Sequence, residues 1–274
     1  MTLRGPGDFA RPCVSSITSG GHRIVLLTAD GVRVEAAYEP GAGGPAVVLA
    51  HGFSGSLDRP ALRRAAAVFA RHAAVVTFSF RGHGRSGGRS TVGDREVLDL
   101  AAAVRWARSL GHRRVVTVGF SMGGSVVLRH GGLYVPGPIP EHAGRTEAHA
   151  DAVVSVSSPA RWFYRGTAPM RRLHWAVTRP AGRVVTRLGL RTRVHGAEWD
   201  PVPLPPVAAV GRIAPRPLLI VHGDRDAYFP LDHPRSLAAA AGASTELWIE
   251  RGFGHAEAAA GVGLLERIAR WAVR

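Results

Sequence analysis

The sequence predicts an α/β protein with a doubly wound, mostly parallel sheet of about eight strands. Short runs of Val, Ala and Leu alternate along the chain with longer segments that carry apolar residues at helical spacing. The runs are apolar at nearly every position, which is typical of strands that helices cover on both faces. Glycine-rich loops follow the runs, and in parallel sheets functional sites lie at these carboxyl ends. The 274 residues, 46% of them hydrophobic, suffice for a large core.

The first two strands are predicted to form an antiparallel hairpin, because Ala29-Asp30-Gly31 is a turn signal between two strand-like segments. The predicted strands are 23–28, 32–38, 46–50, 75–80, 115–118, 151–157, 218–221 and 247–250. The predicted helices of the core are 58–72, with Asp58 as a candidate N-cap, 94–110, 125–130 and about 256–271. Between Gly131 and Ala150 we expect a surface loop.

The alternation of strand and helix stops after the strand at 151–157, and this divides the chain. We predict an N-terminal leader at 1–22, a core formed by 23–158 and 215–274, and an inserted segment at 159–214. The insert is expected to contain two short amphipathic helices that separate near Pro180.

The pattern Gly-x-Ser-x-Gly occurs twice, and its context separates the two matches. Gly119-Phe120-Ser121-Met122-Gly123 lies between a predicted strand and a predicted helix, and such a sharp turn holds the serine hydroxyl out above the sheet. Glycine is needed on either side because a Cβ would clash there. The second match, around Ser86, has loop on both sides. We therefore predict Ser121 as a nucleophile at a nucleophile elbow, with a tight turn in a non-catalytic domain as the alternative.

Further motifs follow predicted strands, and the sheet would bring them together at one edge. They are His51-Gly52-Phe53, Arg81-Gly82-His83-Gly84-Arg85-Ser86, His222-Gly223-Asp224-Arg225-Asp226 and Gly252-Phe253-Gly254-His255. With the Ser121 turn, these motifs resemble the α/β-hydrolase superfamily, in its serine esterase or lipase-like branch. The resemblance covers residues 23–132 and 215–274, and it implies that the insert at 159–214 is a cap over an active site.

The resemblance implies a catalytic triad, because Ser121, Asp226 and His255 follow the family's chain order of serine, acid and histidine. A serine hydroxyl needs a base within hydrogen-bond reach, and the base needs a carboxylate to orient it. Asp224 and His233 are the alternatives. Asp226 is favoured by its spacing to a following proline, and His255 by its place in a glycine-flanked loop after the last strand.

The oxyanion hole needs two backbone donors, and the resemblance points to the N–H groups of Met122 and Phe53. Three histidines at strand ends, His51, His83 and His222, are expected to form hydrogen bonds around the site. Their spacing does not support a metal site, and we predict neither a metal nor a cofactor.

The insert has an unusual composition. From residue 152 to 197 there is no Asp or Glu, but there are nine arginines, at 161, 165, 171, 172, 179, 183, 187, 191 and 193. Its aromatic side chains make Trp162, Phe163 and Trp175, together with Phe53, candidates for lining a substrate pocket. One interpretation is contact with an anionic membrane surface or an anionic substrate group. The favoured interpretation is a solvated cap whose arginines reflect compositional bias.

The whole chain shows the same bias. Its net charge of +15 comes from 35 arginines without a single lysine, and no nucleic-acid-binding motif accompanies them, so no nucleic-acid partner is predicted. The single cysteine, Cys13, excludes an internal disulfide and a cysteine-based metal site. The N-terminal residues contain no apolar run of signal-peptide length, and we expect a cytoplasmic protein.

The predicted function is a carboxylesterase-like serine hydrolase (class EC 3.1.1) that cleaves a carboxylic ester or thioester through an acyl-enzyme. Its substrate is expected to be a small molecule with a small or medium acyl group. Amide, peptide or C–C bond hydrolysis on the same triad is the first alternative, because the fold does not select among these reactions. A non-catalytic, hydrolase-like binding protein is the second. The sequence does not predict the oligomeric state.

Overall fold

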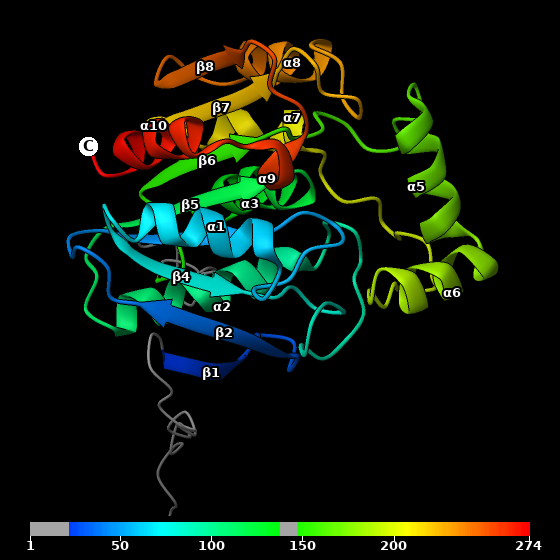
Figure 1. The fold of residues 1–274 in the computed structure, drawn as a ribbon, viewed down its shortest axis with the longest axis horizontal. Coiled ribbons are helices and arrows are strands. Elements are labelled where there is room, and N and C mark those ends of the chain that lie inside the picture. The colour runs from blue at the N-terminus through cyan, green and yellow to red at the C-terminus, as the bar shows by residue number, and fades with distance from the viewer. Residues whose placement is uncertain (1–21, 138–146) are drawn as a thin grey trace, which may run out of the picture.

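The computed structural model describes residues 22–137 and 147–274, and it centres on one eight-stranded sheet (Figure 1). The strand order is β1-β2-β4-β3-β5-β6-β7-β8. β1 pairs antiparallel with β2 and β2 antiparallel with β4, whereas every other neighbouring pair is parallel. The strands are β1 (His22–Leu27), β2 (Arg33–Glu39), β3 (Ala46–Ala50), β4 (Ala74–Phe78), β5 (Val115–Phe120), β6 (Ala152–Val156), β7 (Leu218–Gly223) and β8 (Thr245–Glu250).

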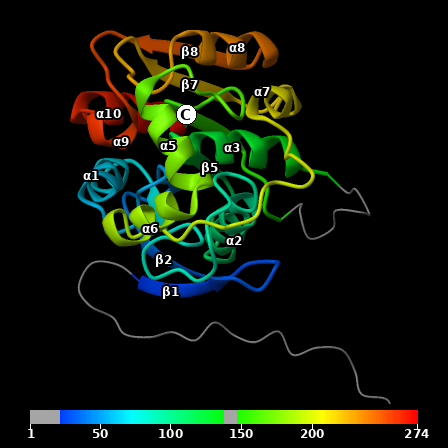
Figure 2. The ribbon, with the colours of Figure 1, turned by 90° about the vertical axis from the view of Figure 1, so that its right-hand side faces the viewer.

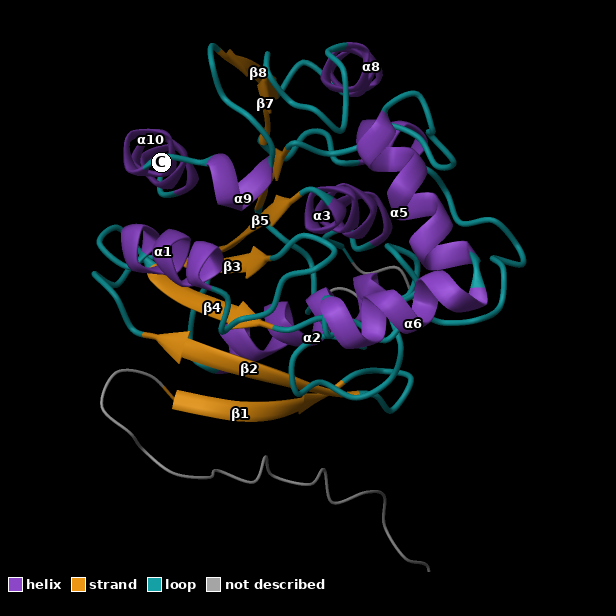
Figure 3. Ribbon diagram, turned by 45° about the vertical axis from the view of Figure 1, so that its right-hand side comes forward, coloured by secondary structure: helices purple, strands orange, loops and turns teal. Residues whose placement is uncertain are grey.

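Helices cover both faces of the sheet (Figure 3). On one face lie α1 (Pro60–Phe69), α9 (Ala256–Ala259) and α10 (Val262–Ala272). On the other lie α2 (Glu96–Ser109), α3 (Met122–Leu133) and α8 (Asp232–Ala240), with the short α7 (Pro206–Ala209) leading into a 3₁₀ turn, Val210–Arg212. The predicted doubly wound α/β class is therefore confirmed.

The central strands are buried on both sides because their side chains alternate between two hydrophobic clusters. In β3, Val47 and Leu49 pack with the side chains of α1 and α10, whereas Val48 and Ala50 pack with those of α2 and α3. All five residues of this strand are fully buried. This continuous burial explains why the strand is apolar at every position.

Three local predictions differ from the structure. α1 begins at Pro60, and Asp58 does not cap it, because the Asp58 carboxylate accepts hydrogen bonds from the Arg23 guanidinium instead. α3 runs on to Leu133, into the segment expected to be loop. The closing helix is divided into α9 and α10, since the backbone is extended at Ala260 and Gly261. Cys13 and most of the predicted leader lie outside the described residues.

The inserted segment forms α5 (Ala168–Thr178) and α6 (Pro180–Gly189), which separate at Pro180 as predicted. Both helices lie to one side of the sheet, beyond the carboxyl ends of the strands (Figures 1 and 2). A parallel bridge between Ser90 and Val194 ties the end of the insert to the loop after β4. Within the described ranges, the structure contains no helix with the length and apolar character needed to cross a membrane.

Candidate active site

Ser121 occupies a strained turn between β5 and α3. Its backbone has φ 53° and ψ −114°, a conformation that a residue with a side chain rarely adopts. The two motif glycines make the turn possible: a Cβ on Gly119 would collide with the carbonyl of Gly123, and a Cβ on Gly123 with the carbonyl of Ala50. The turn therefore depends on backbone contacts that only glycine permits, and it leaves the Ser121 hydroxyl at the N-terminus of α3.

The side chains of Ser121, His255 and Asp226 form a chain of hydrogen bonds. His255 Nε2 lies 2.9 Å from Ser121 Oγ, and His255 Nδ1 lies 2.8 Å from Asp226 Oδ2. The three residues come from the β5–α3 turn, the loop after β7 and the loop after β8, so the parallel sheet brings together positions up to 134 residues apart. A hydroxyl, an imidazole and a carboxylate in this order can generate a serine nucleophile.

The Asp226 carboxylate is held in its ionised form. Burial by itself would raise the pKa of Asp226, but the hydrogen bond from His255 and those from the N–H groups of Tyr228 and Phe229 outweigh it, and the pKa lies below its usual range. Oδ1 accepts the two backbone N–H groups, which leaves Oδ2 for the imidazole. The Tyr228 ring stacks on the His255 ring, with centroids 4.1 Å apart. The Asp226 carboxylate and the stacked Tyr228 ring thus fix the orientation of the His255 imidazole.

Ser86, the serine of the second Gly-x-Ser-x-Gly match, has a structural place. It is 1% exposed, and its hydroxyl donates to the carbonyl of Ser79 and accepts from the N–H of Glu35. The bond to Ser79 closes the loop after β4 on itself, and the bond from Glu35 ties the loop to β2. No histidine in the described residues contacts this hydroxyl, so nothing there activates it.

His233 and Asp224, the alternative base and acid, form hydrogen bonds away from Ser121. His233 is fully buried on α8, where Nδ1 accepts a hydrogen bond from the N–H of Ala160 at 2.9 Å. Asp224 accepts the N–H of Gly252 at 2.6 Å and so stabilises the turn that precedes His255. Neither side chain is hydrogen-bonded to the residues around Ser121.

The loop after β3 carries the N–H of Phe53 and lies beside the Ser121 turn, since a Cβ on Gly52 would be 3.5 Å from the Ser121 Cβ. In the described part of the chain, neither this N–H nor that of Met122 donates a backbone hydrogen bond. The two groups that flank the Phe53 N–H are both held: His83 Nε2 contacts the Phe53 carbonyl, and the N–H of Gly52 donates to Glu257 Oε1 at 3.0 Å. Two backbone donors, the N–H groups of Phe53 and Met122, are thus without a backbone acceptor in the described residues.

Glu257 was not singled out from the sequence. It lies two residues after His255, in α9, and its carboxylate joins the loop that carries Phe53 to the segment that carries the histidine. The one signal in the sequence is an acidic residue close to His255 on a short helix. Nothing in that signal indicates a partner 205 residues away.

His51 and His222 are buried and hydrogen-bonded, as expected for histidines at the strand ends. His51 Nδ1 donates a hydrogen bond to the Gly52 carbonyl at 2.7 Å. Its Nε2 accepts a hydrogen bond from the N–H of Phe80. Burial, and then the neighbouring His83, hold the pKa of His51 well below its usual range. His222 Nε2 donates to the Phe229 carbonyl at 2.8 Å. Both side chains fix the loops that carry the site.

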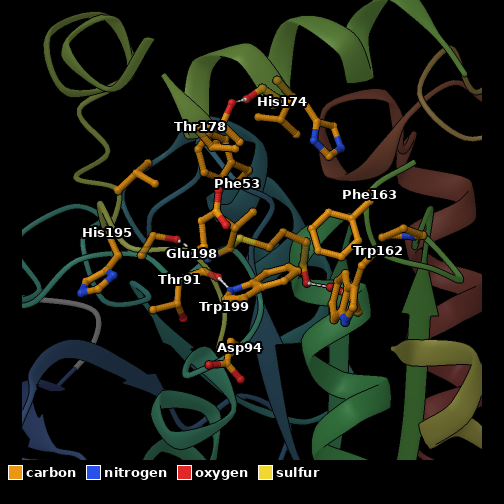
Figure 4. A pocket seen from close by; sticks show the side chains of 18 of the residues that line it. Phe53, Thr91, Asp94, Trp162, Phe163, His174, Thr178, His195, Glu198 and Trp199 are labelled. Atoms are coloured by element: carbon orange, nitrogen blue, oxygen red, sulfur yellow. Dashed lines mark hydrogen bonds between the residues drawn. The ribbon is translucent and has the colours of Figure 1, made fainter. Parts of the chain in front are cut away.

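A cavity of about 600 Å³ lies between the Ser121 turn and the insert (Figure 4). Phe53, Trp162 and Phe163, the candidates for a substrate pocket, line this cavity, and Trp199 adds an indole ring 5.1 Å from that of Trp162. Trp175 does not line it. The inward side of α5 is formed by Met170, Leu173, His174 and Val177 at helical spacing, whereas Trp175 lies on another side and is 48% exposed. Trp175 therefore lies outside this cavity.

Comparison with known proteins shows which fold this chain shares with them. The family model for the α/β-hydrolase fold matches residues 45–166. Esterase Pf2001 of Pyrococcus furiosus superposes with a TM-score of 0.68 at 21% identity, over 95% of this chain and 97% of that one. The chain therefore has the α/β-hydrolase fold. The esterase domain of a Rhodothermus marinus protein is similar to this chain as well, with a TM-score of 0.62 and 19% identity over 93% and 98% of the two chains.

Two curated Mycobacterium tuberculosis proteins, both described as uncharacterized, are 31% identical to this chain over 133 residues. The match spans 46% of this chain and 46% of each relative, so it covers about half of their length. At about 20% identity, the likeness to the solved structures concerns the fold alone. Among the residues that the structure describes, no group of three or more His, Cys, Asp or Glu side chains could hold a metal ion.

Proposed function

We propose that the protein is a serine hydrolase that cleaves a carboxylic ester or thioester through an acyl-enzyme. The observation that supports this proposal is the continuous hydrogen-bonded chain from Ser121 Oγ through His255 to Asp226. The P. furiosus and R. marinus neighbours are both named esterases, which favours an ester over the other compounds that the same side chains could cleave.

Each side chain has a definite task in the proposed reaction. Ser121 Oγ attacks the carbonyl carbon while His255 Nε2 takes the hydroxyl proton, and the N–H groups of Phe53 and Met122 bind the oxyanion that forms. His255 then returns the proton to the departing alcohol, which leaves Ser121 acylated. A water molecule, deprotonated by His255, attacks this acyl-enzyme and releases the carboxylic acid. The ionised Asp226 holds the imidazole in the required tautomer and stabilises the imidazolium.

The cavity favours an acyl group of small or medium size. Its volume of about 600 Å³ lies within the range of sites for small molecules, and aromatic rings form part of its wall. Trp162 donates its indole N–H to the Pro203 carbonyl at 2.8 Å, so a contact within the insert fixes the position of this ring. A rigid aromatic wall limits the length of acyl chain that fits without rearrangement of the insert.

A fluorophosphonate probe tests the nucleophile. Wild-type protein should be labelled at Ser121, Ser121→Ala should not be labelled, and Ser86→Ala, which alters the second motif, should still be labelled if it folds. Heat-denatured wild type serves as the control for nonspecific labelling. Equal labelling of wild type and Ser121→Ala, or no labelling of folded wild type, would refute the serine mechanism and favour a binding protein.

A substrate panel tests the reaction. p-Nitrophenyl esters of increasing acyl length should be hydrolysed with an optimum at short or medium chains, and a matched p-nitroanilide series reports amide hydrolysis. We expect kcat/KM for the best ester to exceed that for its anilide. A higher kcat/KM for the anilide, or for an aminopeptidase substrate, would replace the ester assignment by an amidase on the same site.

A further inference from the structure

Helix α6 turns its apolar side to the solvent. Val184, Val185 and Leu188 lie on one side of the helix and are 55%, 53% and 75% exposed. The side that packs on the rest of the insert carries small or polar residues instead, the buried Gly182 and Thr186. An amphipathic helix of a globular protein normally faces the core with its apolar side. Here the orientation is reversed.

The exposed apolar surface is concentrated in the insert. In the described part of the chain, twelve large hydrophobic side chains are exposed, and seven of them lie between residues 163 and 202: Phe163, Trp175, Val184, Val185, Leu188, Leu190 and Val202. Apolar side chains scattered singly over a surface need no explanation, but a concentration on one element indicates a binding surface. Figure 2 turns the two helices of the insert toward the viewer and shows that they form the outermost layer on this side.

Positive charge surrounds this apolar side. Arg179 precedes α6, Arg187 lies on it and Arg191 follows it, and all three are exposed. Among the described residues, only Arg161 of the nine arginines between 152 and 197 forms an ion pair, with Asp232. The other eight guanidinium groups therefore lack an acidic partner there. A second copy of this chain would bring its own arginines against them, so charge favours an anionic occupant.

We propose that the outward face of α6, defined by Val184, Val185, Leu188, Arg187 and Arg191, docks on an anionic membrane surface. The aliphatic side chains would enter the boundary between headgroups and acyl chains, while the guanidinium groups contact lipid phosphates. Trp175, half-exposed on the neighbouring helix, is the residue type that prefers this boundary. The proposal goes beyond the hydrolase function and does not depend on it.

The docked orientation has a structural consequence for the cavity. Pro180 and Arg183, on the inner side of the α6 segment, line the cavity that reaches Ser121. One short helix thus separates the cavity from the proposed lipid surface. Docking would place the cavity wall within reach of acyl compounds dissolved in the membrane.

Vesicle co-sedimentation of the full chain tests the proposal without any measurement of activity. The vesicles contain phosphatidylcholine and phosphatidylglycerol in equal parts, with pure phosphatidylcholine vesicles as the comparison. We expect binding to the anionic vesicles in dilute buffer, and much weaker binding at about 1 M salt, where the Debye length falls to about 3 Å.

Matched variants distinguish the face of α6 from the overall charge. Leu188→Glu should weaken binding by about tenfold or more, whereas Leu27→Glu should not, although Leu27 on the edge strand β1 is similarly exposed at 65%. Arg187→Glu with Arg191→Glu should weaken binding by about thirtyfold or more. Arg212→Glu with Arg235→Glu changes the net charge equally, at exposed positions outside α5 and α6, and should have a much smaller effect.

Three results would overturn the proposal. The first is no binding of folded wild type to anionic vesicles. The second is equal weakening by both arginine pairs with no effect of Leu188→Glu, which would assign binding to the net charge of the chain. The third is a wild-type dimer in sedimentation velocity that Leu188→Glu converts to a monomer, which would make a second copy the occupant of this face.

Discussion

The Ser121 turn and the insert form opposite walls of one cavity, and they differ in what fixes them. The turn is fixed by backbone: Gly119 and Gly123 pack directly on main-chain atoms, and all of β5 beside them is buried. The helices of the insert are fixed by few buried side chains, with only Met170, Gly182 and Thr186 buried in α5 and α6. The difference indicates that the Ser121 turn tolerates little change, whereas the insert on the other side of the cavity can vary.

The sharpest test of this contrast compares two aspartates that lie two residues apart. Asp226→Asn should lower kcat by about 10⁴-fold with little change in KM, because an amide cannot hold His255 in the right tautomer or stabilise its charge. Asp224→Asn is the control. Its side-chain oxygen can still accept the N–H of Gly252, so steady-state kinetics should remain within a few-fold of wild type. Equal losses in the two variants would remove Asp226 from the proposed mechanism.

Two glycine-to-alanine substitutions compare the walls directly. Gly123→Ala should destabilise the protein by at least about 3 kcal/mol or prevent folding, because the new Cβ meets the carbonyl oxygens of Ala50 and His51. A Cβ on Gly189, at the end of α6, has no described atom within 4 Å, so Gly189→Ala should be neutral or stabilise by about 0.5–1 kcal/mol. Urea unfolding followed by circular dichroism measures both. Similar free energies of unfolding for the two variants would contradict the contrast.

The core should also determine how stability depends on pH. Burial, and then the charge of Arg216, lower the pKa of His130 to about 3, so the folded state keeps this ring neutral while the unfolded chain takes up a proton below about pH 6.5. Since the unfolded state binds more protons in this range, stability is lost as the pH falls. His130 should account for about 2 kcal/mol of the loss between pH 7 and pH 5.

The variant His130→Phe keeps a ring that can stack on Tyr134 and removes the titrating group. Urea titrations at pH 7 and pH 5 give the loss of unfolding free energy between the two pH values for each protein. The loss in the variant should be about 2 kcal/mol smaller than the loss in wild type. Parallel pH dependences of the two proteins would show that His130 does not couple folding to proton uptake.

A smaller effect is expected where the backbone of the site is held by a side chain. Glu257→Ala removes the acceptor for the Gly52 N–H and should lower kcat about tenfold at nearly constant KM, because the Phe53 N–H next to it loses its fixed position. Glu257→Gln keeps an acceptor oxygen and should stay within about threefold of wild type. If Gln lowers kcat as much as Ala does, the charge of the carboxylate and not its hydrogen bond is what matters.

The same contrast explains what the sequence could predict. Strands such as β3 were located because burial on both faces leaves a continuous apolar run, and Pro180 marked the end of α5 since proline cannot continue a helix. The contact between Glu257 and Gly52 was missed because no local pattern encodes a hydrogen bond across the sheet. The sequence could not show that Trp175 lies outside this cavity, because hydrophobicity identifies an apolar side chain and not the side of the insert that faces solvent.

The smallest effects should come from the insert, and two tryptophans separate its inner from its outer side. Trp162→Ala enlarges the cavity and should raise KM for the best short ester about three- to tenfold, while shifting the optimum toward longer acyl chains. Trp175→Ala, on the outside, should leave both KM and the acyl optimum for dissolved esters unchanged. The p-nitrophenyl ester panel measures the two variants side by side. A shift in Trp175→Ala equal to that in Trp162→Ala would mean that the insert rearranges around the substrate, and then the cavity described here would not set the acyl preference.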